Sequence, residues 1–153
     1  MKKLIIIKKV RKENSKEISE LIFRVFNKFI ANNFEEQSIE KWLHGHSPRE
    51  QEKRMKIRDI YVALDKNKII GVIEGNKQDK IVGLFIDEKY QRQGIAKILV
   101  KRIELLYKKR GIKKIKIFSS LYAQKFYKKV GYKKSTKLIK KDGMVYQPME
   151  KDL

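Results

Sequence analysis

The stretch from residue 80 to residue 119 constrains the fold more than any other part of the chain. Residues 80–87 are mostly apolar and predict a strand. A long helix is expected at about 94–110, because apolar residues recur there on one helical face and a glycine follows. Residues 113–119 alternate and predict a second strand. The order strand, helix, strand predicts a βαβ unit with one parallel pair of strands.

The flanking segments predict more helices and a set of antiparallel strands. The helices are expected from Asn14 through Phe29, around 35–43, over 48–56 and at about 121–130. The strands are expected at 3–9, 59–64 and 69–74, with a closing hairpin around 141–143. Together these elements predict a mixed sheet with helices on both of its faces.

Composition limits the class of protein. At 153 residues and with no Gly/Ser/Pro-rich linker, residues 1–153 are expected to form a single domain. The absence of cysteine excludes a disulfide scaffold, a thiolate-bound metal and a cysteine nucleophile. The N-terminal apolar run Leu4–Ile7 is shorter than the roughly 7–15 residues of a secretory signal core. A cytoplasmic domain without a membrane partner is therefore expected.

The charge of the chain is strongly positive. Lys and Arg total 39 against 18 Asp and Glu, a formal net charge of +21. One interpretation is attraction for an anionic partner, such as nucleic acid, a membrane surface or a phosphorylated ligand. The other is a solvated surface on which lysine is simply the common polar residue. Under either interpretation the summed field concentrates polyphosphate ligands near the protein.

The loop between the strand at 80–87 and the following helix carries the clearest chemical signal. Residues Gln91 to Ala96 have the pattern Gln-x-x-Gly-x-Ala at a helix start. A helix start offers free N–H groups and partial positive charge, so it binds anions. Gly94 permits close approach of a phosphate, and Arg92 adds a cation, so a pyrophosphate fits. The pattern is neither the dinucleotide fingerprint nor a Walker A loop.

A second block makes the pattern specific. Residues Ala123 to Tyr132 have the form Ala-x-x-Phe-Tyr-x-x-x-Gly-Tyr, after the strand that ends near Ser119. With the Gln91–Ala96 loop, this resembles the GCN5-related N-acetyltransferase (GNAT) superfamily. The resemblance implies the GNAT fold, of class α/β (α+β). Its central sheet is mixed and mostly antiparallel, with about six to seven strands flanked by about four helices.

The resemblance also implies a ligand and its binding residues. Acetyl-CoA is the expected co-substrate, with no metal. Its pyrophosphate is expected on the amides that follow Gln91, and its pantetheine arm along the strand edge at Leu84, where two strands diverge. Members of the family often have Asn where Ser120 stands, and Ser can still make one polar contact. The implied coenzyme-binding residues are Leu84, Phe85, Ile86, Gln91, Arg92, Gln93, Gly94, Ile95, Ala96, Lys97, Ser120 and Tyr127.

Two residues are expected to take part in proton transfer. Tyr127 matches the general acid of the family, which protonates the departing thiolate. With a phenol pKa near 10 and a thiol pKa near 8.5, that transfer is uphill by about 2 kcal/mol. Glu74, one strand earlier, is the candidate carboxylate base, acting directly or through water. The alternatives are an ordinary core tyrosine, a solvent-facing glutamate and deprotonation of the amine by a chain of waters.

The region after the first helix is expected to cover the acceptor. Residues 33–59 contain six acidic and six basic residues, so this lobe is neutral and suits an ammonium substrate. Trp42 is expected in the core or in the pocket wall. His44 and His46 form either a small metal or catalytic pair or a plain loop between helices.

The function implied is an acetyl-CoA-dependent N-acetyltransferase, an acyltransferase that acts directly on a primary amine. Its expected partner is a small-molecule or peptide amine, and it is expected to be a monomer or homodimer. The alternatives are a basic nucleic-acid-binding module and a non-catalytic coenzyme A sensor on the same fold. RNA-recognition and helix-turn-helix signatures are absent, which argues against nucleic acid.

Overall fold

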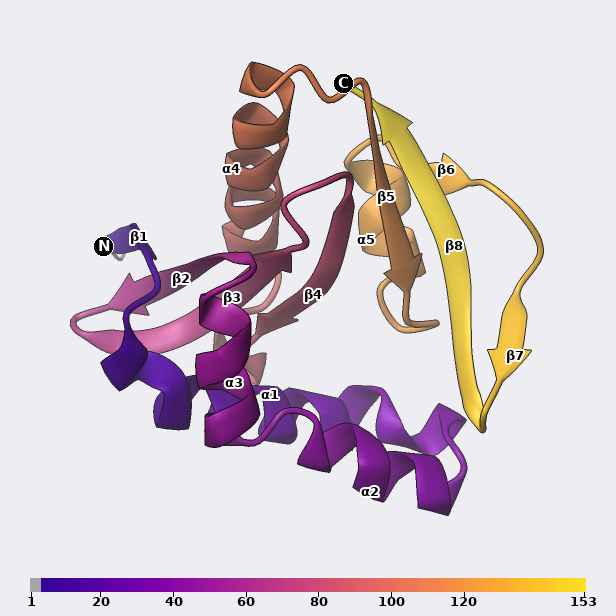
Figure 1. The fold of residues 1–153 in the computed structure, drawn as a ribbon, viewed down its shortest axis with the longest axis horizontal. Helices are drawn as coiled ribbons and strands as arrows, with labels where there is room; N and C mark the ends of the chain where they lie inside the picture. Colours follow the sequence, from indigo (N-terminus) through magenta and orange to yellow (C-terminus); the bar gives the residue numbers. More distant parts are fainter. Residues whose placement is uncertain (1–3) are drawn as a thin grey trace.

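An eight-stranded mixed sheet runs through the computed structural model, which describes residues 4–153 (Figure 1). The strand order is β1-β2-β3-β4-β5-β8-β6, and β7 pairs with β8. Only the β4–β5 pair is parallel among the described strands, as the βαβ pattern predicted. The strands are β1 (Ile5–Lys9), β2 (Asp59–Asp65), β3 (Lys68–Gly75), β4 (Lys80–Ile86), β5 (Lys114–Ser119), β6 (Lys133–Lys134), β7 (Ile139–Lys141) and β8 (Met144–Asp152).

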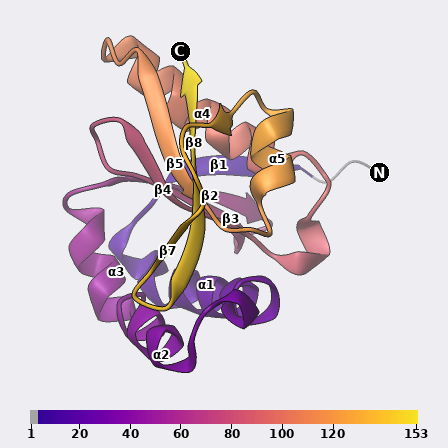
Figure 2. The ribbon, with the colours of Figure 1, turned by 90° about the vertical axis from the view of Figure 1, so that its right-hand side faces the viewer.

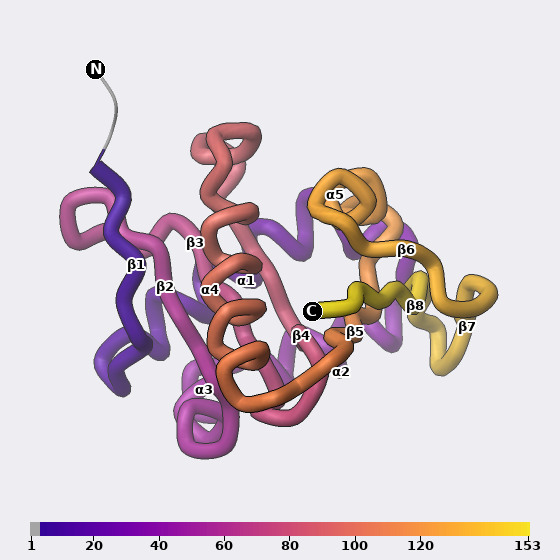
Figure 3. The backbone as a smooth tube through the Cα atoms, turned by 90° about the horizontal axis from the view of Figure 1, so that it is seen from above, coloured from indigo at the N-terminus to yellow at the C-terminus, as the bar shows by residue number. Residues whose placement is uncertain are grey.

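Five α-helices of the described chain cover the two faces of the sheet (Figures 2 and 3). They are α1 (Ser15–Phe29), α2 (Glu36–His44), α3 (Pro48–Met55), α4 (Ile95–Lys109) and α5 (Gln124–Lys129). Helix α1 buries an apolar face against β2, β3 and Phe85, joined there by Trp42 and Met55. Helix α4 packs on the other face, where Tyr127 and Tyr132 complete a second core. None of these helices is long and apolar enough to cross a membrane.

The predicted fold class is confirmed, with small differences in the elements. The strand expected at 3–9 is β1, and Lys3 lies outside the described residues. The C-terminal segment forms three strands, because a short strand at Lys133–Lys134 precedes the closing hairpin. In that hairpin, Asp142 and Gly143 both have positive φ, as a two-residue turn of type I′ requires.

Two polar side chains at the start of α1 make hydrogen bonds outside the helix. Asn14 and Glu17 have the spacing of a capping box, yet α1 has no side-chain cap. The Asn14 carboxamide oxygen instead accepts a hydrogen bond from the Arg11 amide, 2.8 Å away. The Glu17 carboxylate accepts one from the amide of Ile69, in β3, at 2.7 Å. Both side chains therefore fasten α1 to its neighbours.

The divergence of β4 from β5 positions everything that follows. Within the described chain their parallel pairing is limited to Lys80–Lys116 and Ile81–Ile117, after which the strands part (Figure 1). On its other edge β4 skips a residue: Gly75 faces Ile81 while Glu74 faces Gly83. Val82 is thus the extra residue of a bulge, which bends and twists a strand. The bulge lies directly after the last residue paired with β5, so it turns β4 away.

Substituting Gly75, at the end of β3, with alanine should destabilise the fold. A Cβ built there overlaps the hydroxyl of Tyr107, which is fully buried and accepts a hydrogen bond from the Lys77 amide. We expect Gly75→Ala to lower the free energy of unfolding in urea by about 1–3 kcal/mol. The matched control is Gly45→Ala, where φ is −68° and the nearest neighbour of a Cβ is 3.5 Å away. Equal losses in both variants would show that the Tyr107 contact is unimportant.

Candidate active site

A cavity of about 180 Å³ lies where β4 and β5 diverge. One wall comes from β4, from the end of β5 and from α5. It contains four of the residues expected to bind the coenzyme: Leu84, Phe85, Ser120 and Tyr127. Ile86 is not part of this lining and packs in the core with α4. The opposite wall comes from the α1–α2 region and from the β7–β8 hairpin.

Tyr127 is held in the cavity wall by other aromatic rings. Its ring makes edge contacts with Phe126 and Tyr132, at centroid distances of 5.1 and 5.6 Å, and is 5% exposed. Burial raises the pKa of the Tyr127 hydroxyl, because the phenolate would lose its hydration. At neutral pH the side chain is therefore a protonated phenol, which can donate a proton or a hydrogen bond.

The loop before α4 has the geometry of an anion site. Arg92 and Gly94 both have left-handed backbone angles, with φ of 61° and 82°. Gly94 is the residue before the helix, and no side chain caps the free N–H groups of the first turn. A Cβ at Gly94 would meet no atom within 4 Å, so its glycine is required by the backbone angle and not by packing.

Two hydrogen bonds of Gln91 fix this loop beside the cavity. The Gln91 carboxamide nitrogen donates to the carbonyl of Ile86 at 3.1 Å, which ties the loop to the end of β4. Its oxygen accepts from the hydroxyl of Tyr122, which precedes α5. The Tyr122 ring in turn stacks on Phe29 of α1 at 4.6 Å. The loop, α1 and the α5 segment are thus connected at one edge of the cavity.

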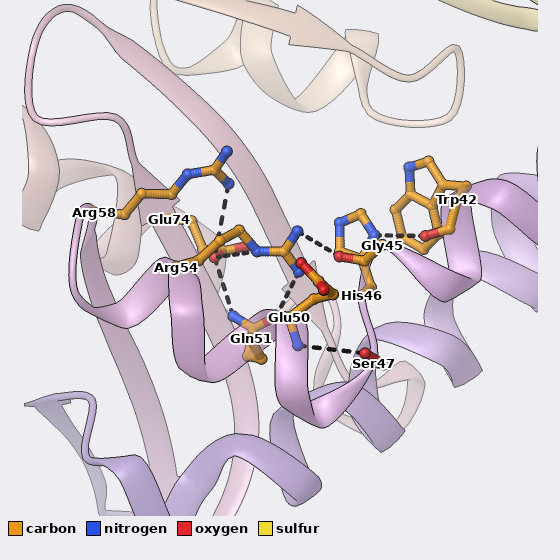
Figure 4. Close-up of polar contacts among 9 residues, drawn as sticks. All are labelled: Trp42, Gly45, His46, Ser47, Glu50, Gln51, Arg54, Arg58 and Glu74. Carbon is orange, nitrogen blue, oxygen red and sulfur yellow. Dashed lines mark hydrogen bonds and ion pairs between the residues drawn. The ribbon is translucent and has the colours of Figure 1, made fainter.

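Glu74 is the centre of a buried polar cluster (Figure 4). The side chain is 2% exposed, and its Oε1 accepts a hydrogen bond from Gln51 at 3.0 Å. The same oxygen lies 3.6 Å from Arg54 Nε and 4.0 Å from an Arg58 nitrogen. Glu74 does not line the cavity, but its Oε2 would be 3.3 Å from a Cβ at Gly83, which does. The predicted base therefore lies directly behind the wall of the cavity.

His46 and Trp42 form a stack beside this cluster. Trp42 lies between Phe26 and His46, with both centroid distances 3.8 Å. The His46 Nδ1 is 2.8 Å from the Trp42 carbonyl, so this nitrogen carries the proton. Burial lowers the pKa of His46 to about 4, and the nearby guanidinium groups of Arg54 and Arg58 act in the same direction. His46 is therefore a neutral, structural side chain, and no metal-binding group occurs among residues 4–153.

A larger cavity, of about 320 Å³, lies between α1 and the short turn of helix at Glu88–Tyr90. Its acidic side chains are already paired: Asp87 with Arg24 at 3.0 Å and Glu88 with Lys28 at 2.6 Å. None of the described residues that line this cavity belongs to the Gln91–Ala96 loop, to the Ala123–Tyr132 block or to the diverging strands β4 and β5. The smaller cavity is therefore the candidate active site.

Several residues of the candidate site were not expected from the sequence. Arg54 lies in α3 and Arg58 follows three residues after the end of that helix, and both approach Glu74 of a distant strand. The residues of the opposite wall come from segments that the two sequence blocks do not include. They are Ile30, Phe34, Trp42, Met144, Val145 and Tyr146, of which only Trp42 was considered as a pocket wall. Two of them, Phe34 and Trp42, belong to the neutral lobe of residues 33–59.

Sequence comparison identifies a domain that covers most of the chain. Residues 30–153 match a family model described as acetyltransferase (GNAT) domain. The chain is also 30% identical over 74 residues to the uncharacterized protein YyaT of Bacillus subtilis (strain 168). That match covers 48% of this chain and 50% of YyaT, so it spans about half the length of the curated relative.

Two solved structures have a similar fold. One is described as a GCN5-related N-acetyltransferase from Rhodopseudomonas palustris; the TM-score is 0.87 at 18% identity, over 100% of this chain and 99% of that one. The other is the PaiA N-acetyltransferase of Thermoplasma acidophilum in complex with coenzyme A. Its TM-score is 0.82 at 22% identity, over 98% of this chain and 99% of that one. At these identities the likeness shows the fold alone.

His46 should make stability depend on pH. Its pKa is 6.5 in the unfolded chain and about 4 in the folded one, so the unfolded state binds its proton first as the pH falls. The stability that His46 contributes at neutral pH should therefore be lost progressively as the pH falls from about 7 towards 4, by about 3 kcal/mol. The measurement is urea unfolding across this range, for the wild type and for His46→Phe, which keeps a ring against Trp42. The variant should lose less stability on acidification; parallel curves would contradict the prediction.

Proposed function

Because the chain belongs to the GNAT acetyltransferase family, we propose that it transfers the acetyl group of acetyl-CoA directly to a primary amine. Three structural features that this reaction needs support the proposal, because they occur close together. The edge of β4 and the ring of Tyr127 line the gap between β4 and β5, and Gln91 ties the loop before the uncapped start of α4 to the end of β4. The Thermoplasma relative, solved with coenzyme A, supports this choice of co-substrate.

The start of α4 would bind the pyrophosphate of the coenzyme. Its first-turn N–H groups are without a capping side chain, and the left-handed angles at Arg92 and Gly94 direct successive backbone amides to one side. The net charge of +21 attracts the phosphates from a distance. Gln93 Nε2 donates to the Lys89 carbonyl at 3.2 Å, which keeps the loop folded. We therefore propose that residues 91–97 bind the coenzyme.

The free edge of β4 would hold the thioester. Among residues 4–153, β4 has no strand partner on the β5 side past Ile81, so backbone N–H groups near Leu84 can donate to the pantetheine arm and to the acetyl carbonyl. Ser120 accepts a hydrogen bond from the Ala123 amide at 3.2 Å and lines the same cavity. Ser120 can therefore donate its hydroxyl hydrogen to the pantetheine arm.

The reaction needs two proton transfers. The amine nitrogen attacks the carbonyl carbon, a C–N bond forms, and the C–S bond breaks. The departing thiolate takes the proton of Tyr127, which regains one from solvent. The raised pKa of Tyr127 makes it a weaker acid, so the transfer depends on the same apolar surroundings raising the thiol pKa as well.

Glu74 is the proposed acceptor of the amine proton, through water. Its Oε1 is occupied by Gln51 and the two arginines, while its Oε2 lies behind Gly83. Gly83 has no side chain to cover this oxygen, and the Phe85 ring, which also lines the cavity, is the other group near the position of a Gly83 Cβ. A water relay past Gly83 would let Glu74 act without leaving its partners.

Replacing Gly94 should abolish coenzyme binding without unfolding the protein. In Gly94→Leu a side chain would occupy the anion site, and the left-handed φ of 82° would cost about 1–2 kcal/mol of stability. Gly111→Leu is the matched control, because Gly111 has φ of 84° at the other end of α4 and equally open surroundings. Calorimetry with acetyl-CoA should show binding by the control and none by Gly94→Leu. Equal affinities would refute the assignment of this loop.

Removing the Tyr127 hydroxyl should reduce turnover more than it changes the KM for acetyl-CoA. We expect kcat of Tyr127→Phe to fall by about 10²–10⁴-fold where chemistry is rate-limiting, because the proton is needed only as the thiolate leaves. Tyr132→Phe is the control, since it removes the hydroxyl of the adjacent ring, which donates to Glu104. Turnover at the wild-type rate in Tyr127→Phe would make Tyr127 a packing residue.

A further inference from the structure

The wall opposite the coenzyme side of the cavity is entirely uncharged. Its residues come from two regions far apart in the sequence, the end of α1 to α2 and the start of β8. Of the described residues that line the cavity on either side, none is Asp, Glu, Lys, Arg or His. A polycationic acceptor would have to bury extra ammonium groups here without a carboxylate to pair them, which is strongly unfavourable.

Trp42 cannot replace a carboxylate as a cation-binding group. Its two ring faces are covered by Phe26 and His46, each at a centroid distance of 3.8 Å. The indole therefore contributes its edge to the cavity, and it meets Phe85 there at 5.9 Å with a 65° interplanar angle. A ring edge carries the positive part of the quadrupole, so it repels an ammonium and favours the face of an aromatic or an aliphatic group.

The β7–β8 hairpin limits the size of the acceptor. The amide of Glu35 donates to the Gly143 carbonyl at 2.8 Å, and the Ser38 hydroxyl donates to the carbonyl of Asp142. The turn of the hairpin accordingly lies beside the segment of α1 and α2 (Figures 1 and 2). These hydrogen bonds hold the hairpin, whose Val145 lines the cavity, against the start of α2, and Glu35 itself is exposed. At about 180 Å³ the cavity is below the roughly 300–1,000 Å³ of pockets for drug-sized ligands.

The charges nearest to the cavity also disfavour additional positive groups. Glu74 is shared between Arg54 and Arg58, so this cluster has one positive charge in excess. The whole chain adds a net charge of +21. Such a field repels polyamines and aminoglycosides, and it favours the neutral form of a single amine, which is the form that attacks.

We propose that the acceptor is a small monoamine whose single primary nitrogen is carried on an apolar body, aromatic or branched aliphatic. The inference rests on the proposed function and names its substrate class. The apolar body packs between Trp42, Tyr146 and Val145, and the nitrogen faces the thioester at β4. Amines with two or more positive charges are excluded by the same wall.

The test is the steady-state rate of coenzyme A release with two sets of amines. Phenylethylamine and isoamylamine represent the proposed class, and putrescine, spermidine and kanamycin represent polycations. The expected kcat/KM is at least about 10- to 100-fold higher for the first set. A polycation acetylated as well as phenylethylamine would overturn this inference and leave the acetyltransferase function standing. Acetyl-CoA binding with transfer to neither set would also overturn it, whereas failure of acetyl-CoA to bind would refute the proposed function itself.

A carboxylate placed in the wall should change this preference. Val145→Glu and Met144→Glu, made separately, should raise kcat/KM for spermidine by roughly tenfold and lower it for phenylethylamine. Lys109→Gln, at the exposed end of α4, is the control that makes the same change of one unit in net charge away from the cavity. Melting temperatures verify that the variants fold. Unchanged preference in both folded wall variants would contradict the placement of the acceptor.

Discussion

The divergence of β4 from β5 is the constraint on which the site depends. Two pairs of facing residues hold the strands together, and the bulge at Val82 then turns β4 away from β5. The bend leaves backbone groups of β4 without a strand partner and opens space for Tyr127 to reach from α5. The end of β4 is tied to the Gln91–Gly94 loop by the hydrogen bond from Gln91 to Ile86, which is the arrangement that the proposed coenzyme site requires. Without the bulge, β5 would continue to pair with β4 and close the gap.

The two ends of this gap differ in charge. The basic surface and the free amides of α4 suit the phosphates of a coenzyme. None of the described residues that line the far wall is charged, and the cluster of Glu74 with Arg54 and Arg58 lies behind the lining residue Gly83. That cluster and the stack of His46 on Trp42 hold the α2–α3 segment against the sheet. The wall that contains Trp42 is therefore supported from behind by His46 and the Glu74 cluster, none of which lines the cavity.

The sequence predicted the features that depend on local pattern. The helices of 3.6-residue period, the βαβ unit and the glycine stops were all recognisable, and so was the loop with Gly94, because one motif contains it. The bulge at Val82 was not recognisable. A bulge changes the register between paired strands, and a uniformly apolar strand sequence gives no sign of it. The partners of Glu74 and the contact of Gly143 with Glu35 were also hidden, because they join segments far apart in the chain. Glu17 shows the same limit, as its capping pattern is overridden by a tertiary hydrogen bond to Ile69.

Backbone amide NMR spectra recorded with and without coenzyme A test the central claim most directly. If the diverging strands and the start of α4 bind the coenzyme, the largest shift changes should fall in residues 84–86, 91–97 and 119–123. Amides beside the larger cavity at Arg24 and Lys28 should change little. The largest changes around Arg24 and Lys28, or weak changes scattered over the basic surface, would contradict the account.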